Sequence, residues 1–275
     1  MEHEKSGSEY IIAISIVASA LILSGVIWVA ASGVNANLFE LKSAIESIQI
    51  TGGGPTGGTL QPTATVPAGA TVFTPEQVNA FLAKAAGVKG SDSAEIAILE
   101  FSDYQCPYCR RHFNAVYPQI DGAYVKSGKA KLAFLDFPLD FHPSAPLAAN
   151  AARCAGEQGK YWEAHDAVFA GQNPQGQGTV QFSAQDVKQW IGNVSGIDKN
   201  KLDTCIDSNK YADKVKENAQ LGQQVGITGT PGFLIGGYLL TGACPFESFK
   251  TAIDSVLDGK GFSQTPDSCI INVLS

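Results

Sequence analysis

The clearest pattern along the chain is a pair of short apolar runs separated by a helical pattern. Residues 94–101 read "AEIAILEF" and residues 130–137 read "AKLAFLDF". Runs of this length, bounded by polar residues, predict buried strands. Between them, from Pro107 to about Ser127, apolar residues recur at helical spacing. The order strand, helix, strand predicts an α/β domain.

A further helix is predicted just before the first apolar run. The sequence "TPEQVNAFLAKAAG" begins at Thr74, a good N-cap residue, with Pro75 in the first helical position. Gln77 is placed to complete a capping box with Thr74, and Gly87 is a typical stop signal.

Helical signals dominate the second half of the chain, over residues 144–225. Four helices are predicted there, beginning near Ser144, Tyr161, Ser183 and Asp198. After them, "TGTPGFLIGGYLLTG" predicts a strand from Phe233, a hairpin turn at Gly236 and Gly237, and a return strand. The sequence "PFESFKTAIDSVLDG" then predicts a closing helix.

The N-terminal region follows a different pattern. Residues 10–32 are uncharged and almost entirely apolar. The segment is long enough for a helix to cross a bilayer, which takes about 20 residues. They follow an acidic segment, residues 1–9, that is unlike the start of a cleaved signal. We therefore expect an uncleaved membrane anchor, although Val34-Asn35-Ala36 resembles a weak cleavage site.

Two connecting segments follow the predicted anchor. Residues 33–50 carry apolar side chains at helical spacing and predict a short juxtamembrane helix, either alone or self-associating. Residues 51–72 are uncharged and rich in Gly, Thr and Pro, which is typical of a flexible linker. The ordered domain is expected to occupy residues 73–275.

Charge and cysteine content narrow the chemistry. The 275 residues carry a formal net charge of −7 and no basic stripe, which argues against a nucleic-acid partner. There are six cysteines, two of them in "FSDYQCPYCRRHF" at Cys106 and Cys109. Such a pair can hold a metal, form a structural disulfide or carry out redox chemistry. A zinc site is disfavoured because the other four cysteines are scattered and no two of the four histidines are closely spaced.

The position of this pair indicates redox chemistry. The cysteines lie between a predicted strand and a predicted helix, the setting in which C-x-x-C is typical of a redox motif. A helix N-terminus carries partial positive charge, so it stabilises a thiolate at Cys106. Pro107 suits the first helical position. We expect Cys106 to be exposed and to react with substrate, and Cys109, one turn deeper, to resolve the mixed disulfide.

Three separated motifs resemble one family. The stretches "LEFSDYQCPYC", "FPLDFHPSAPLAANAARCAGEQGKYWEAHDAVF" and "GITGTPGFLIGG" are similar to the membrane-tethered, DsbA-like branch of the thioredoxin superfamily, over roughly residues 72–260. The resemblance implies a thioredoxin fold with an inserted helical domain at about 144–225. It also implies an extracytoplasmic thiol–disulfide oxidoreductase that needs no cofactor. Its partners would be dithiol substrate proteins and a quinone-linked membrane reoxidase.

The resemblance also assigns roles to individual residues. Cys106 and Cys109 match the catalytic pair. Pro231 matches a proline that is cis in this superfamily, and the backbone of Thr230 would pair with an extended substrate strand. Glu100 matches a buried acid that assists proton transfer at the inner cysteine; the alternative is a partly exposed carboxylate at a strand end.

One departure leaves the direction of the reaction open. The strongest oxidants of the family carry His where this chain has Tyr108. Two alternatives therefore stay open. One is a reductase or isomerase of the same fold, and the other is a tethered chaperone or adaptor that only holds peptides. Nearby, we expect Arg110 to be solvated, His112 to have no role in the chemistry, and His142 to be a hydrogen-bonded turn residue.

The remaining cysteines are assigned with the help of the resemblance. Some relatives have a second disulfide at places that match Cys154 and Cys205, so we expect these two to pair. Cys244 and Cys269 would then form another bond, with free thiols or an intermolecular link as alternatives. Asn193 begins a glycosylation acceptor pattern, of a kind that arises often by chance.

Overall fold

The computed structural model of the chain describes residues 72–274. The predicted anchor, juxtamembrane helix and nearly all of the predicted linker lie outside the described residues. Within 72–274, no helix combines the length and the apolar character needed to cross a bilayer.

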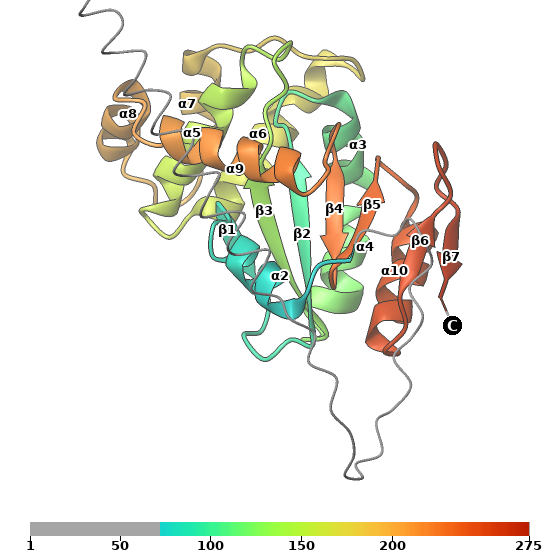
Figure 1. Ribbon diagram of the computed structural model, residues 1–275. Coiled ribbons are helices and arrows are strands. Elements are labelled where there is room, and N and C mark those ends of the chain that lie inside the picture. The colour runs from blue at the N-terminus through green and yellow to red at the C-terminus, as the bar shows by residue number, and fades with distance from the viewer. Residues whose placement is uncertain (1–71, 275) are drawn as a thin grey trace, which may run out of the picture. The chain divides into compact units, whose positions relative to one another are not determined.

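A five-stranded mixed sheet forms the centre of the domain, with the strand order β1-β3-β2-β4-β5 (Figure 1). The two predicted apolar runs form its central strands. β2 is parallel to β3 and antiparallel to β4, while β1 and β5 are antiparallel edge strands. The strands are β1 (Gly87–Lys89), β2 (Ile96–Ser102), β3 (Ala130–Asp136), β4 (Gly232–Ile235) and β5 (Tyr238–Thr241).

Different helices cover the two faces of the sheet. One face packs against α4 (Tyr117–Ile120) and α10 (Phe246–Leu257). The other packs against α2 (Pro75–Leu82) and α9 (Ala212–Gln224). Every residue of β2 is buried, because both faces are covered. Side chains alternate along a strand, so the even-numbered residues of β2 face α4 and α10.

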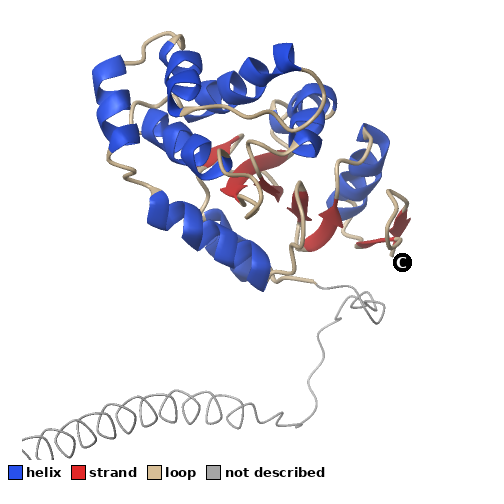
Figure 2. Ribbon diagram, turned by 90° about the horizontal axis from the view of Figure 1, so that it is seen from above, coloured by secondary structure: helices blue, strands red, loops and turns tan. Residues whose placement is uncertain are grey.

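A group of helices is inserted between β3 and β4. It consists of α5 (Ala145–Gly156), α6 (Tyr161–Gln172), α7 (Ala184–Gly192) and α8 (Lys199–Asp207), with a 3-10 turn at Asn173–Gln175. These helices share an apolar core with Tyr104, Cys106 and Cys109, which follow β2. The helical group and the C-terminal hairpin lie at opposite ends of the sheet (Figures 1 and 2). This arrangement agrees with the predicted thioredoxin fold and its helical insertion.

Several local predictions agree with the structure. The Thr74 hydroxyl accepts a hydrogen bond from the Gln77 N–H, and the Gln77 side-chain oxygen accepts one from the backbone N–H of Thr74. The four predicted helix starts at 144, 161, 183 and 198 coincide with the starts of α5, α6, α7 and α8. Gly236 and Gly237 have φ values of 55° and 101°, which the two-residue turn between β4 and β5 requires.

The segment predicted to be helical from Pro107 to about Ser127 is helical, but it is not one continuous helix. The segment divides into α3 (Pro107–Ala115), α4 and a π-helical turn, Asp121–Val125. Pro118 has no N–H to donate to the preceding turn, and a proline ring clashes with that turn in a helix interior. The helix therefore breaks at Val116, where φ is −112°.

Some short elements were not predicted. Gly87 belongs to β1 and is not a helix stop, since α2 already ends at Leu82. The helix predicted from Asp198 ends at Asp207, because Asn209 adopts a left-handed conformation with φ of 50°, and α9 follows as a separate helix. The C-terminal hairpin of β6 (Phe262–Gln264) and β7 (Ile271–Val273) was also missed.

Candidate active site

The loop between β2 and α3 positions the two cysteines of the motif. Cys106 is the N-cap residue of α3, with extended backbone angles, and Pro107 occupies the first helical turn. Both cysteines are free thiols in this structure. Cys109 is fully buried, and Cys106 is only 3% exposed, so the expectation of an exposed Cys106 is wrong.

The segment before β4 covers Cys106. The Thr230–Pro231 peptide bond is cis, and the Cys106 thiol donates a hydrogen bond to the Thr230 carbonyl over 3.4 Å. The structure thus brings the two predicted substrate-binding residues against the predicted reactive sulfur. The predicted pairing with a substrate strand would involve the backbone of this same residue, Thr230.

The environment of the two sulfurs separates their acidities. The Cys109 thiol donates a hydrogen bond to the Cys106 sulfur and lowers the pKa of Cys106 to about 6. Burial opposes this shift, while the Thr230 side chain and the backbone N–H groups of the first helical turn support it. Burial raises the pKa of Cys109 well above its usual value, and the adjacent Cys106 raises it further. Near neutral pH, Cys106 is therefore the thiolate and Cys109 the thiol.

Glu100 lies in the middle of β2, two residues before the end of the strand. Its side chain is buried, not at an exposed strand end. Burial raises the pKa of Glu100 to about 7, and the Ser102 hydroxyl opposes part of that rise. A carboxyl group of this acidity can gain and lose a proton near neutral pH.

His112 is closer to the site than the sequence indicated. It is buried on α3 between the rings of Phe233 and Phe249, at centroid distances of 4.8 and 5.1 Å. Its Nε2 atom lies 3.8 Å from a Glu100 oxygen. Burial lowers the pKa of His112 to about 3, so the ring is neutral at physiological pH.

Arg110 is buried, so the expectation that it would be solvated is wrong. Its guanidinium donates hydrogen bonds to the carbonyls of Gly176 and Gly178, at 2.5 and 2.8 Å. These carbonyls belong to the loop between α6 and α7, which the sequence gave no reason to place over α3. Arg110 therefore anchors the helical insertion to the catalytic helix.

Asp103 organises the catalytic loop, and the sequence analysis missed it. Its carboxylate accepts hydrogen bonds from the backbone N–H groups of Gln105 (2.7 Å), Cys106 (3.1 Å) and Leu139 (2.8 Å). Its second oxygen lies 2.8 Å from Nδ1 of His142, which is the hydrogen-bonded turn histidine that was expected. An Asp that bonds the N–H groups two and three residues ahead is a recognisable turn signal.

The helical insertion holds the rest of this loop. The Gln105 amide donates to the Val180 carbonyl at 2.9 Å and accepts from the Ser144 N–H at 2.8 Å. The Gln172 amide donates to the Tyr104 carbonyl at 2.8 Å. The catalytic loop is thus fixed on both sides before any substrate binds.

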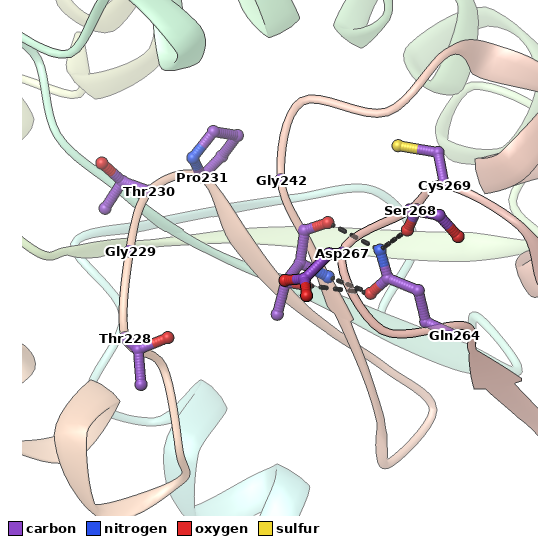
Figure 3. A pocket seen from close by; sticks show the side chains of 10 residues that line it. Thr228, Gly229, Thr230, Pro231, Gly242, Gln264, Asp267, Ser268 and Cys269 are labelled. Carbon is purple, nitrogen blue, oxygen red and sulfur yellow. Dashed lines mark hydrogen bonds between the residues drawn. The ribbon is translucent and has the colours of Figure 1, made fainter.

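A groove extends from the cis-proline segment (Figure 3). Residues 228–231 form one wall and residues 264–269 the other, and the space between them measures about 360 Å³. The Gln264 amide forms the far wall by bonding the backbone N–H and carbonyl of Thr241, at 2.8 and 2.9 Å, and the Ser268 carbonyl. The groove includes Thr230, whose carbonyl contacts the Cys106 sulfur.

Two disulfides lie outside the catalytic pair. Cys154 on α5 is bonded to Cys205 on α8, and Cys244, just before α10, is bonded to Cys269 in the C-terminal hairpin. The second bond attaches the Gln264–Cys269 wall of the groove to the sheet domain. In the described part of the chain, no three His, Cys, Asp or Glu side chains form a group that could hold a metal ion.

Comparison with known proteins supports the same chemistry. A model of the thioredoxin family matches residues 83–255. The chain is 27% identical over 180 residues to the probable disulfide bond formation protein D of Bacillus anthracis. The matched region covers 61% of this chain and 76% of that protein.

Two further similarities are informative in different ways. The oxidised structure of BdbD from Bacillus subtilis superposes with a TM-score of 0.60 at 22% identity, over 69% of this chain and 99% of that one, and so supports the fold. The chain is also 25% identical over 169 residues to the Na(+)/H(+) antiporter NhaA 3 of Salinispora tropica. The match spans 61% of this chain but only 24% of that antiporter's length, and the rest of that protein is not matched.

Proposed function

Because this chain belongs to the thioredoxin family and is a protein-disulfide oxidoreductase, we propose that it donates the Cys106–Cys109 disulfide to dithiol substrate proteins. The observation that carries the proposal is the low pKa of Cys106, about 6, beside a cis-proline segment. A stabilised Cys106 thiolate favours the reduced form of the enzyme, and an enzyme that favours its reduced form gives up its disulfide readily.

The reaction proceeds through a mixed disulfide at Cys106. A substrate thiolate attacks the Cys106 sulfur of the oxidised enzyme, and the electron pair of the broken bond leaves on Cys109. A second substrate thiolate then attacks the substrate sulfur of the mixed disulfide and releases Cys106 as a thiolate. The low pKa of Cys106 makes it the better leaving group in this second step.

Substrate binding uses the backbone of the cis-proline segment. We propose that an extended substrate pairs with Thr230 and places its cysteine at Cys106, with its next residues in the adjoining groove. When Cys106 is a protonated thiol, it donates a hydrogen bond to the Thr230 carbonyl. Oxidised enzyme has no thiol proton at Cys106, so it leaves this carbonyl free for substrate.

The cellular setting is part of the proposal. Residues 10–32 would anchor the chain in a membrane, with the catalytic domain on the extracytoplasmic side. Two disulfides away from the active site support an oxidising compartment, since structural disulfides are rare in the cytosol. A quinone-linked membrane thiol oxidase would regenerate the Cys106–Cys109 disulfide.

Trapping the mixed disulfide tests this proposal. Cys109→Ser in the full chain should accumulate covalent complexes with substrate proteins: its Cys106 thiolate attacks a substrate disulfide, the other substrate sulfur leaves as a thiolate, and no Cys109 thiol remains to resolve the mixed disulfide. Cys106→Ser is the matched control and should accumulate none. The complexes should disappear on adding reductant, which separates them from tight binding by a chaperone or adaptor. Adducts with Cys106→Ser alone would reverse the roles of the two cysteines, and adducts with neither variant would favour peptide holding.

A further inference from the structure

Two polar residues interrupt an otherwise apolar central strand. β2 reads "IAILEFS", and its last polar members, Glu100 and Ser102, are both buried, at 4% and 1% exposure. Residues two apart in a strand point to the same face. Glu100 and Ser102 therefore lie on the face of the sheet that packs against α4 and α10, where an apolar pair would be the usual choice.

The facing side of α3 carries the partners of these two residues. Cys109 and His112 are three positions apart, so they share one face of the helix. At one end, the Asp103 N–H, adjacent to Ser102, donates to the Cys109 sulfur over 3.5 Å. At the other end, His112 lies 3.8 Å from Glu100. Ser102 is thereby placed between the Cys109 sulfur and the Glu100 carboxyl.

The Ser102 hydroxyl has no structural use that accounts for its burial. Among residues 72–274 it has no hydrogen-bond partner of ordinary geometry. Leaving a buried hydroxyl unpaired costs stability. Burial raises the pKa of both Glu100 and Cys109, and the Ser102 hydroxyl opposes that rise in each.

We propose that the Ser102 hydroxyl relays a proton between the Cys109 sulfur and the Glu100 carboxyl. The inference rests on the proposed function and adds a catalytic residue to it. A hydroxyl can accept one proton while it donates another, which neither an apolar residue nor a backbone N–H can do. Hydrogen bonds of this kind are often long before reaction and tighten during it.

The relay accounts for the protons in both half-reactions, the reduction of the enzyme by substrate and its reoxidation. When substrate reduces the enzyme, the electron pair of the disulfide leaves on Cys109. The Ser102 proton moves to that sulfur, the Glu100 proton moves to Ser102, and Glu100 becomes a carboxylate. When an oxidant disulfide reacts with Cys106, Cys109 passes its proton to Ser102 and Ser102 passes one to Glu100. The Cys109 thiolate then attacks Cys106 and expels the oxidant's thiolate.

The other titratable groups around Glu100 do not replace this route. His112 is neutral and has its Nδ1 atom unpartnered among the described residues, and its low pKa makes it a poor proton acceptor near neutral pH. The Asp103 carboxylate is already occupied by four partners: the N–H groups of Gln105, Cys106 and Leu139 and the ring of His142. Ser102 is therefore the group that joins the buried thiol to the buried acid.

Glutathione disulfide provides a two-step test on the full chain. Its reaction with reduced enzyme first forms a glutathione adduct at Cys106, and attack by Cys109 then releases the second glutathione. Rapid acid quenching and mass spectrometry follow both steps. Ser102→Ala should leave the first step unchanged and slow the second about a hundredfold, the lower end of general acid–base effects. The variant should fold, because it removes an unpartnered hydroxyl.

Ser255→Ala is the matched control. Ser255 is a buried serine on α10 whose hydroxyl bonds the Gly261 carbonyl, and its loss should change neither step. The wild-type second step should accelerate as pH rises through the titration of Glu100, and Ser102→Ala should lose this dependence, which a merely structural role would not produce. A second step as fast and as pH-dependent as that of the wild type would overturn the relay alone. If the wild type forms no adduct at Cys106, the proposed function falls and the relay falls with it.

Discussion

Replacing Glu100 with glutamine should stabilise the reduced protein above pH 7 and have no such effect below about pH 4.5, where both folded and unfolded Glu100 hold their proton. Burial raises the pKa of Glu100 from 4.5 to about 7. The difference corresponds to about 3 kcal/mol, at about 1.4 kcal/mol for each pKa unit. Between these two pH values the unfolded chain releases a proton that the folded chain keeps, so wild-type stability falls as pH rises.

The difference between the two proteins isolates this effect. His112 has a pKa lowered to about 3 by burial, and its contribution therefore makes stability increase with pH up to about 6.5. That contribution and those of the other buried groups are present in both proteins and cancel in the comparison. The free energy of unfolding of Glu100→Gln minus that of the wild type should rise from pH 4.5 to 7 and then remain constant.

Urea unfolding at a series of pH values measures this difference. Cys106 and Cys109 are kept reduced, and the fluorescence of Trp162 and Trp190 reports unfolding of the full chain. Glu95→Gln, which makes the same substitution at an exposed position just before β2, is the matched control against which the change for Glu100→Gln is read. A difference for Glu100→Gln that stays constant from pH 4 to 8 would refute the claim that this carboxyl is buried and has a raised pKa.

Three further predictions concern the catalytic loop. The ultraviolet absorbance of the Cys106 thiolate in Cys109→Ala should titrate above pH 6 but below the ordinary value of about 8.5, since the variant removes the thiol donor and keeps the backbone N–H groups of the helix; a midpoint at or above about 8.5 would contradict the assigned environment. Asp103→Ala should lower the free energy of unfolding by roughly 3 kcal/mol or more, because four buried donors lose their acceptor, whereas Ala at the exposed Asp140 should have little effect. Tyr108→His should raise the reduction potential, because a histidinium adds positive charge beside the thiolate; an unchanged potential would show that this position does not tune the site.

Local signals predicted much of the fold. The central strands, the capping box at Thr74 and the Gly236-Gly237 turn follow from short sequence patterns, because each depends on neighbouring residues alone. The break at Val116 was missed although Pro118 predicts it, since the apolar spacing continues across it. The three-residue strands β1, β6 and β7 carry too few residues to show a period.

The site was predictable where it rests on a motif and not where it rests on contacts between distant segments. The Cys106–Cys109 pair and the Thr230–Pro231 segment were identified from sequence. The burial of Cys106 was not, because its cover comes from residues more than a hundred positions away. The burial of Arg110 was misjudged for the same reason: the insertion loop that buries it lies more than 60 positions away in the chain. The rings of Phe233 and Phe249 bury His112, and the sequence did not place them beside it.

The reduction potential of the Cys106–Cys109 pair tests the proposed donation of a disulfide most directly. It is obtained by equilibrating the purified full chain with glutathione buffers of known ratio and quantifying the two cysteines by alkylation. A Cys106 pKa of about 6 lies between those of the strongly oxidising and the reducing members of the superfamily. The potential should therefore fall between about −120 and −270 mV. A value at or below about −270 mV would contradict the account and assign the chain to the reductases.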